Sequence, residues 1–280
     1  MSDQPSPYGS APRAQQATRV RISHLKQMKV DGQKWAMLTA YDMYSAAIFE
    51  EAGIPVLLVG DSAGNNVYGN ENTLSVTVDE LIPLVRAVTR STQRALVIAD
   101  LPFGAYQASV EQCFNTAVRF MKEAGAHAVK LEGGIEVLPQ VEKLASSGIP
   151  VMAHIGFTQQ LEHQLGGYRV QGRGEDAQRL IDSAKAFEAA GAFAILIEMV
   201  PGDVGGAITA AVSIPTVGIG AGNQCDAQVL VWQDMAGLRT GRLPRFVKQY
   251  ADLRSILHTA AMEFAGEVEA GTFPGPEHTF

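Results

Sequence analysis

The sequence predicts a single α/β domain folded as a (β/α)8 TIM-type barrel, on three observations. Short apolar segments with strand character recur eight times along the 280 residues. Continuous runs such as VLLVGDS, ALVIADLP and AILIEMV are typical of parallel strands that are covered on both faces. Segments with helical spacing separate most of these runs, and no linker divides the chain. Length and strand number favour the barrel over the alternative, a doubly wound open sheet.

Most of the predicted strands end in Gly, Asp or Glu. The eight strands are expected over residues 35–42, 56–62, 95–102, 128–134, 151–157, 194–201, 216–222 and 229–237. Only residues 223–228 separate the last two strands, fewer than the ~10 to 12 that a crossover normally needs. Either the crossover helix is missing there or one of the two strands is misassigned.

Helices are predicted where apolar residues recur at 3.6-residue spacing, as they do over residues 109–124 and 176–190. Gly125 and Gly191 follow these segments, and we expect them to cap the helix C-termini. Helical spacing returns over residues 245–270. These helices would cover the outer face of the predicted barrel.

The two ends of the chain and its charge narrow the class of protein. A polar start predicts a disordered tail over residues 1–20, ahead of a catalytic barrel domain over 21–280 whose last residues, 272–280, are suited to docking on a neighbour. The 22 Lys plus Arg against 29 Asp plus Glu give a net charge of −7, which disfavours nucleic acid and anionic membranes as partners. Cys113 and Cys225 form no CxxC, and no secretory signal or membrane span is recognisable, so we expect a cytoplasmic protein with reduced thiols.

Polar residues stand at the ends of five otherwise apolar strands, where parallel barrels place their active sites. They are Asp61 with Ser62, Asp100, Lys130 with Glu132, His154, and Glu198. Lys130 and Glu132 are two positions apart and therefore point to the same face of their strand. Each acid taken alone is most simply a strand-end cap, but five such strand ends at one rim predict a functional cluster.

The residue types of this cluster predict its chemistry. Asp61, Asp100 and Glu132 cannot all ionise close together without compensation, so a divalent cation such as Mg²⁺ is expected among them. Glu198, deep in an apolar strand, is placed to act as a general base. Lys130 is an anchor for an anionic substrate, a Schiff-base nucleophile or an inert counter-ion, with the anchor favoured. His154 is either a hydrogen-bonded core histidine or a ligand contact.

Two glycine-rich loops complete the predicted rim. The segment GGYRVQGRG at residues 166–174 combines four glycines and two arginines, a composition that suits a mobile cationic lid over an anionic ligand. The segment GIGAG at 218–222 brings backbone N–H groups to the same rim, although a short glycine run is a weak signal for an anion site.

The stretches VGDS, ADLPF, VKLEGG, HIGFT, GGYRVQGRG, IPTVGIGAG and VLVWQDM, with TAYD near the start and EHTF at the end, resemble the ketopantoate hydroxymethyltransferase family over residues 22–280. The resemblance implies a (β/α)8 barrel of the phosphoenolpyruvate/pyruvate superfamily. It also implies transfer of a hydroxymethyl group from the co-substrate 5,10-methylenetetrahydrofolate to 3-methyl-2-oxobutanoate through a Mg²⁺-stabilised enolate. The product would be 2-dehydropantoate, in pantothenate biosynthesis.

The same resemblance implies roles for individual residues. Asp61 and Asp100 would ligate one Mg²⁺ per subunit and contact the substrate, and Glu132 would complete the metal site. Ser62 and Lys130 would hold the substrate, with His154 as a further contact, and Glu198 would be the proton acceptor. The family also implies a homodecamer.

The chain departs from the usual family pattern in three loops. Residues 156–161 read GFTQQL where the family usually has GLTPQS or GFTPQS, Met43 replaces a common aromatic residue, and residues 70–75 alter a third loop. None of these changes removes a chemical group named above. Two other functions share much of this signature: a metal-dependent C–C lyase or aldolase acting on another 2-oxo acid, and a non-catalytic protein that binds a 2-oxo acid.

Overall fold

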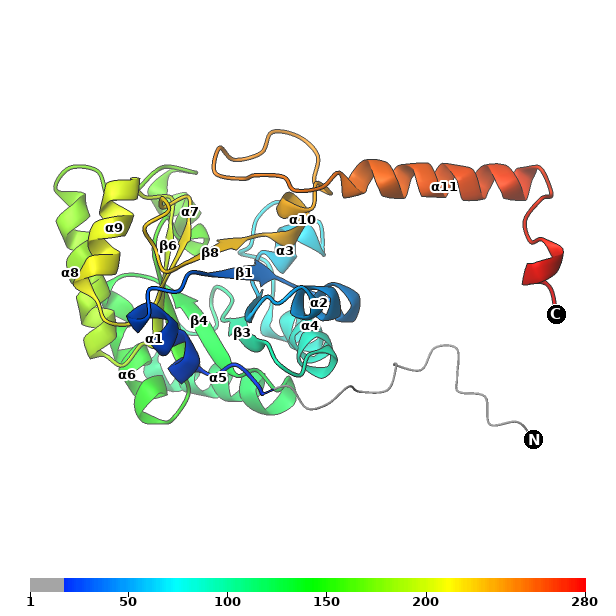
Figure 1. Ribbon diagram of the computed structural model, residues 1–280. Helices are drawn as coiled ribbons and strands as arrows, with labels where there is room; N and C mark the ends of the chain where they lie inside the picture. Colours follow the sequence, from blue (N-terminus) through cyan, green and yellow to red (C-terminus); the bar gives the residue numbers. More distant parts are fainter. Residues whose placement is uncertain (1–17) are drawn as a thin grey trace.

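The chain folds as a closed parallel barrel, in a computed structural model that describes residues 18–280. The strands follow one another around the barrel in chain order, and β8 pairs with β1 to close it (Figure 1). They are β1 (Trp35–Thr39), β2 (Val56–Val59), β3 (Leu96–Asp100), β4 (Ala128–Glu132), β5 (Val151–Gly156), β6 (Ala194–Glu198), β7 (Thr216–Ile219) and β8 (Ala227–Leu230). The predicted barrel is confirmed, and the open sheet is excluded.

Helices cover most of the outer face of the barrel. They are α1 (Ile22–Val30), α2 (Met43–Glu51), α3 (Ala63–Asn66), α4 (Val78–Ser91), α5 (Val110–Glu123), α6 (Leu138–Ser146), α7 (Glu162–Leu165), α8 (Asp176–Ala189), α9 (Gly202–Ala211), α10 (Trp232–Met235) and α11 (Leu253–Glu269), with 3-10 turns η1 (Ile135–Val137), η2 (Gln159–Leu161) and η3 (Pro276–His278). Ser109 caps α5 by accepting a hydrogen bond from the Gln112 N–H. Gly125 and Gly191 follow α5 and α8 with φ of 75° and 95°, the left-handed conformation expected of glycines after a helix.

Alternate residues of each strand face the inside of the barrel, because side chains alternate with a period of two. Inward residues such as Met37, Ile98 and Leu196 form one buried cluster, which Leu25 of α1 joins. The outward residues pack with the helices in a second cluster. On β3, β4, β5 and β6 the inward positions become polar near the C-terminal end of the strand, and this change positions the site.

The first seven strands end one to three residues before their predicted ends, and the eighth differs more. The eighth strand covers Ala227–Leu230 rather than 229–237, and the residues after it turn into α10. The Trp232 N–H donates to Thr39 Oγ1 at 3.0 Å, so the chain turns where it meets β1. No helix lies between β7 and β8. Of the two explanations for the short connection, the missing helix is therefore the correct one.

The C-terminal helix begins at Leu253 rather than at residue 245. The preceding segment is held against α10 instead: the Tyr250 N–H donates to the Met235 carbonyl at 2.8 Å and the Leu253 N–H to that of Ala236 at 3.0 Å. Asp252 then caps the helix by accepting from the Ser255 N–H. Tertiary contacts thus delay the helix beyond the start of its sequence pattern.

The N-terminal boundary also moves. The first 17 residues of the tail expected over residues 1–20 lie outside the described part of the chain. Arg19 donates from its guanidinium to the carbonyls of Ala95 and Thr92 at 2.7 and 2.9 Å. The Val20 N–H donates to the Arg94 carbonyl at 2.7 Å, and its side chain is buried, so both residues pack on the barrel.

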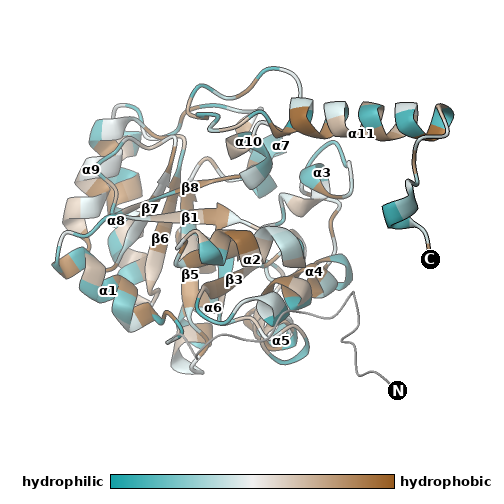
Figure 2. Cartoon of the chain, turned by 45° about the vertical axis from the view of Figure 1, so that its right-hand side comes forward, coloured by the Kyte–Doolittle hydropathy of each residue, from teal (hydrophilic) through white to brown (hydrophobic). Residues whose placement is uncertain are grey.

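Helix α11 stands away from the barrel and carries η3 at its far end (Figure 1). None of its residues is buried. Its exposed apolar side chains are Ile256, Leu257, Met262, Phe264 and Val268, and Figure 2 shows hydrophobic patches along it. Within residues 18–280, none of the helices combines the length and the apolar character needed to cross a membrane.

Candidate active site

The polar strand ends predicted from the sequence meet inside the C-terminal mouth of the barrel. Parallel pairing places Asp100 beside Lys130 and Glu132 beside His154. Glu198 ends β6 opposite Gly156, while Asp61 and Ser62 follow β2 in a turn. All seven residues line one small cavity of about 50 Å³ at this mouth.

Lys130 is the buried cation among the acids. Its side chain is 3% exposed, and Nζ lies 2.8 Å from Asp100 Oδ1 and 3.4 Å from Glu132 Oε1. Burial alone lowers the pKa of this ammonium, but the carboxylates of Asp100, Glu132 and Asp61 outweigh it and raise the pKa above its ordinary value. Lys130 therefore stays protonated, which disfavours imine formation and suits electrostatic binding of an anion.

His154 links two of the carboxylates. Its Nδ1 lies 3.0 Å from Glu132 Oε1, and its Nε2 lies 3.3 Å from Glu198 Oε2. Burial disfavours the charged ring, yet the Glu132 carboxylate raises the pKa of His154 to about 9. Burial likewise raises the pKa of Glu132, but His154 and Lys130 together lower it to about 2. The structure thus places His154 within the polar cluster, at the site rather than in the apolar core.

Asp61 and Asp100 are the two acids of the cluster whose pKa values are raised. Burial raises the pKa of both side chains, and for Asp61 the neighbouring charges of Asp100 and Glu132 raise it further. The Asp61 N–H donates to Asp100 Oδ2 at 3.2 Å. Both acids are nearly inaccessible to solvent, so water cannot screen their repulsion.

The donor set of the cluster fits a hard divalent cation. Asp61, Asp100 and Glu132 each offer an oxygen, and these oxygens lie within 4.8 Å of one another. Oxygens at neighbouring octahedral positions of one Mg²⁺, each at about 2.1 Å, lie about 3 Å apart, so the three carboxylates are close enough to share a cation after small side-chain movements. The cation would also offset the charge of the acids that Lys130 and His154 leave unbalanced.

The turn from β5 into η2 is shaped to fit Glu198. Gly156 has φ of 92°, and a Cβ there would collide with the Glu198 carbonyl. The Phe157 N–H donates to that carbonyl at 2.8 Å. Met199, the residue after Glu198, has a positive φ of 49°, a conformation that few non-glycine residues adopt.

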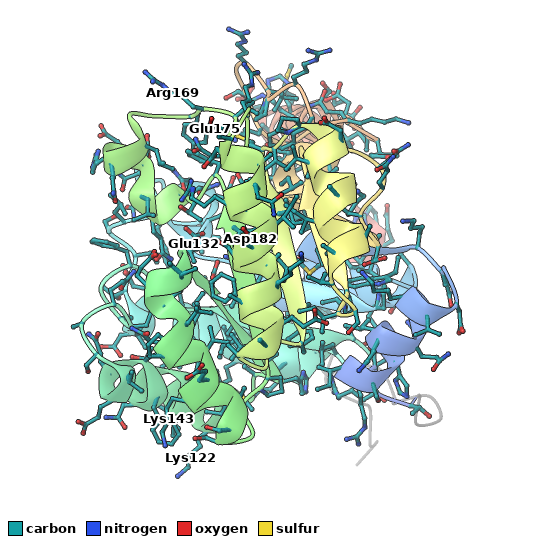
Figure 3. The ribbon with its side chains drawn as sticks, turned by 90° about the vertical axis from the view of Figure 1, so that its left-hand side faces the viewer. Lys122, Glu132, Lys143, Arg169, Glu175 and Asp182 are labelled. Carbon is teal, nitrogen blue, oxygen red and sulfur yellow. The ribbon has the colours of Figure 1, made fainter. Side chains whose placement is uncertain are left out.

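Both glycine-rich loops lie at the rim of the mouth: Ile219 lines the small cavity, and the Gln171 N–H donates to the Met199 carbonyl at 2.9 Å. In the loop at 166–174, Tyr168 packs on buried Phe157 with ring centroids 4.8 Å apart, while Arg169 stands at the edge of the molecule, away from Glu132 (Figure 3). In the loop at 218–222, Gly222 packs closely on Gly202 of α9. A Cβ at Gly220 of the same loop would approach the Phe246 ring, so this loop too is tightly packed.

Sequence reasoning missed two residues that contact the cluster, Gln160 and Tyr106. The Gln160 backbone N–H donates to Glu132 Oε2, and its side-chain Nε2 donates to Asp61 Oδ2, both at 3.0 Å. The Tyr106 hydroxyl lies 2.7 Å from both Gln160 Oε1 and the Glu132 carbonyl. Both residues lie in loops rather than at strand ends, so strand periodicity gives no signal for them.

Beyond Glu132 and Gln160 lies a larger cavity of about 500 Å³. Gln140 of α6 and Leu180 of α8 contribute to its lining. Gln160 therefore stands between this cavity and the carboxylate cluster.

The whole chain is similar to proteins of known family. The family described as ketopantoate hydroxymethyltransferase matches residues 19–276. A 3-methyl-2-oxobutanoate hydroxymethyltransferase of Nocardioides sp. is 67% identical over 286 residues, covering 99% of this chain and 97% of the relative. One of Saccharopolyspora erythraea is 65% identical, covering 98% and 93%.

Solved structures share the fold at low sequence identity. A phosphonopyruvate hydrolase in complex with oxalate and Mg²⁺ matches with a TM-score of 0.59 and 15% identity, covering 92% of both chains. A 2,3-dimethylmalate lyase, a member of the PEP mutase/isocitrate lyase superfamily, matches with a TM-score of 0.56 and 15% identity, covering 91% of this chain and 89% of the other. These likenesses support the barrel fold.

Proposed function

The chain belongs to the ketopantoate hydroxymethyltransferase family and is an enzyme of that family, and from this premise we propose its reaction. It transfers a hydroxymethyl group from 5,10-methylenetetrahydrofolate to 3-methyl-2-oxobutanoate, giving 2-dehydropantoate for pantothenate biosynthesis. The observation that carries the proposal is the buried triad of Asp61, Asp100 and Glu132, with Lys130 and Glu198 at the same cavity.

The triad holds a divalent cation, which we propose to be one Mg²⁺ per subunit. When bound, Mg²⁺ would supply a Lewis acid that stabilises the negative charge developing on the substrate. Lys130, kept protonated by its acidic neighbours, attracts the substrate carboxylate. Ser62 Oγ, 2.8 Å from the Tyr41 hydroxyl, is a further hydrogen-bonding group for the substrate at the same rim.

Glu198 is the base that removes the proton from C3 of the 2-oxo acid. Its carboxylate lies 3.3 Å from His154 Nε2, at the same cavity as Lys130 and the acid triad. After the transfer, Glu198 carries the proton, and the electron pair of the broken C–H bond passes to the substrate as its enolate. Glu198 thus accepts the proton, and the protonated Lys130 at the same cavity stabilises the negative charge that develops on the substrate.

One water adds to the methylene carbon of the folate and releases it from both nitrogens, which take up the two protons of the water, so tetrahydrofolate and a carbonyl at the level of formaldehyde result. The enolate carbon then bonds to this carbonyl carbon, and the carbonyl oxygen takes the proton from Glu198 to become the hydroxyl of 2-dehydropantoate. No electron acceptor or donor is needed, because the folate enters already at the oxidation level of formaldehyde.

Exchange of the C3 proton tests the base directly. In deuterated water with Mg²⁺, the wild-type enzyme is expected to exchange this proton of 3-methyl-2-oxobutanoate for deuterium. NMR spectroscopy monitors the loss of the proton signal. Glu198→Gln should lose at least about 100-fold in exchange rate, with substrate binding retained in calorimetry. Glu111→Gln, an exposed position on α5, is the matched control. Exchange by Glu198→Gln at the wild-type rate would refute the base assignment, and saturable binding without any wild-type exchange would favour a non-catalytic binder.

The one-carbon donor needs a separate assay. Product formation should depend on 5,10-methylenetetrahydrofolate and saturate with it. An enzyme that makes product equally well from free formaldehyde, and never from the folate, would instead be a lyase or aldolase that shares the metal and the barrel.

We also propose that the chain assembles as a homo-oligomer, a decamer by family resemblance. Helix α11 exposes Ile256, Met262 and Phe264 by 55 to 62%, and the helix after β8 in the barrel wall is only the four-residue α10. We propose that a second copy covers these side chains of α11. Light scattering should give a mass well above 29.9 kDa, and Phe264→Asp should reduce it; a monomeric wild type would refute this assembly.

A further inference from the structure

Gln160 contacts two of the three acids from a single position. Its backbone N–H reaches Glu132 Oε2 and its side-chain Nε2 reaches Asp61 Oδ2, each at 3.0 Å. Asp61 and Gln160 are 99 residues apart in the sequence, and Gln160 is 4% exposed. One residue in η2 therefore joins the loop after β2 to the end of β4.

The side-chain amide of Gln160 is held in one orientation. Nε2 also donates to the Leu101 carbonyl at 3.0 Å. On the other side, Oε1 lies 2.7 Å from the Tyr106 hydroxyl and accepts from Gln107 Nε2 at 3.1 Å. An amide has two N–H donors and two lone pairs on oxygen, and all of them face partners here. Turning the amide over would point Oε1 at the Asp61 carboxylate, so the network selects the orientation with N–H groups toward the acid.

The hydrogen bonds from Gln160 orient the Asp61 and Glu132 carboxylates and still leave lone pairs on their oxygens for a cation. A carboxylate has about four lone-pair sites on its two oxygens. The Gln160 amide takes one site of Asp61, and Glu132, whose Oε1 also contacts Lys130 and His154, keeps about one site for a cation. Without such a donor, the mutual repulsion of Asp61, Asp100 and Glu132 would drive the side chains apart or force one to bind a proton. Groups that orient metal ligands commonly account for about 10- to 100-fold in metal affinity.

We propose that Gln160 is a positioning residue for the divalent-cation site, holding the Asp61 and Glu132 carboxylates near one another against their mutual repulsion. The proposal rests on the metal site of the proposed function. Gln160 does not touch the reacting atoms in this scheme; it acts through the two carboxylates. Tyr106 supports it by facing Gln160 Oε1, and loss of the Tyr106 hydroxyl should have the same effect in weaker form.

The test measures Mn²⁺ binding without substrate, by electron paramagnetic resonance of free Mn²⁺. Gln160→Leu keeps the size of the side chain and removes its hydrogen bonds, and it should weaken Mn²⁺ binding by about 10- to 100-fold. Gln164→Leu, in the neighbouring α7 and exposed, should bind as the wild type does. Proton exchange at saturating metal should recover in Gln160→Leu, with the metal concentration for half-maximal rate raised.

The outcomes of the Mn²⁺ binding experiment either uphold or overturn the role of Gln160. Wild-type Mn²⁺ affinity in a folded Gln160→Leu protein would overturn the proposal, because a purely structural role lowers Tm without moving metal affinity. If Gln160→Leu does not fold, Tyr106→Phe decides, with a loss of about 3- to 10-fold expected and an unchanged affinity overturning the proposal. A wild type that binds no Mn²⁺ would overturn it together with the metal site. Mn²⁺ binding that depends on Gln160, without folate-dependent transfer, would uphold the proposal and refute the proposed function alone.

Discussion

Replacing Lys130 with methionine removes a buried ammonium while nearly preserving the side-chain volume. Lys130 Nζ lies 2.8 Å from Asp100 Oδ1 and 3.4 Å from Glu132 Oε1. At an effective dielectric constant of about 20, these contacts correspond to attractions of about 6 and about 5 kcal/mol. The variant avoids the cost of burying the ammonium, which is several kcal/mol and offsets part of these attractions. The free energy of unfolding should therefore fall by about 3–5 kcal/mol.

The loss should grow with pH. Burial, before any charge effect, raises the folded-state pKa of Asp61 and Asp100 above their ordinary values. A carboxyl with a raised folded pKa stabilises the fold below its unfolded pKa, and this contribution is lost as pH rises through the folded pKa. Without Lys130 both pKa values rise further, so Lys130→Met should lose more stability at pH 8 than at pH 5.

Thermal melting at fixed protein concentration, with a chelator present, measures this difference. At pH 8 the melting temperature of Lys130→Met should fall by roughly 6–20 °C. Lys122→Met is the control, because Lys122 points into solvent at the edge of the molecule (Figure 3), and it should change Tm by at most about 2 °C. A Lys130→Met protein that melts within 2 °C of wild type (about 1 kcal/mol or less), or an equal loss at both pH values, would refute the electrostatic reasoning.

Three further outcomes follow from the same site. Gly156→Ala should destabilise the fold by at least about 2 kcal/mol in urea unfolding, since its Cβ would strike the Glu198 carbonyl from a backbone with φ of 92°; an unchanged midpoint would contradict this. The His154 ring should titrate near pH 9 by ¹⁵N NMR, because Glu132 offsets its burial, and its contribution to stability should decline above about pH 6.5 and vanish above pH 9; titration near 6.5 would disprove the pairing. Mg²⁺ at 100 times its Kd should stabilise the wild type by about 2.7 kcal/mol, whereas a Tm indifferent to Mg²⁺ would argue against the site.

Strand periodicity carried most of the site prediction. Lys130 and Glu132 share a face because they are two residues apart, and both lie at the C-terminal end of a strand with continuous apolar character. The same argument applied to Asp100, His154 and Glu198 brought them to one mouth, since the carboxyl ends of parallel strands lie on the same side of a barrel.

The errors lie where local pattern and tertiary contact disagree. Residues 231–237 have strand-like composition, yet the chain turns into α10 where Trp232 meets Thr39 of β1. The helical pattern from residue 245 is overruled until Leu253, because Tyr250 pairs with Met235 instead. In both cases a hydrogen bond to a distant part of the chain ends or delays an element that the local sequence favours.

The sequence by itself determined the barrel, the rim that holds the site, and the acids that line it, because these follow from the two-residue period of strands and the direction of parallel pairing. Only the tertiary structure decided that His154 bridges Glu132 and Glu198 and that Gln160 joins Asp61 to Glu132. These contacts join residues on different strands and loops, and their distances depend on how the closed barrel sets neighbouring strands in register. The raised and lowered pKa values arise from the same closure, since burial and neighbouring charge exist only once those residues meet.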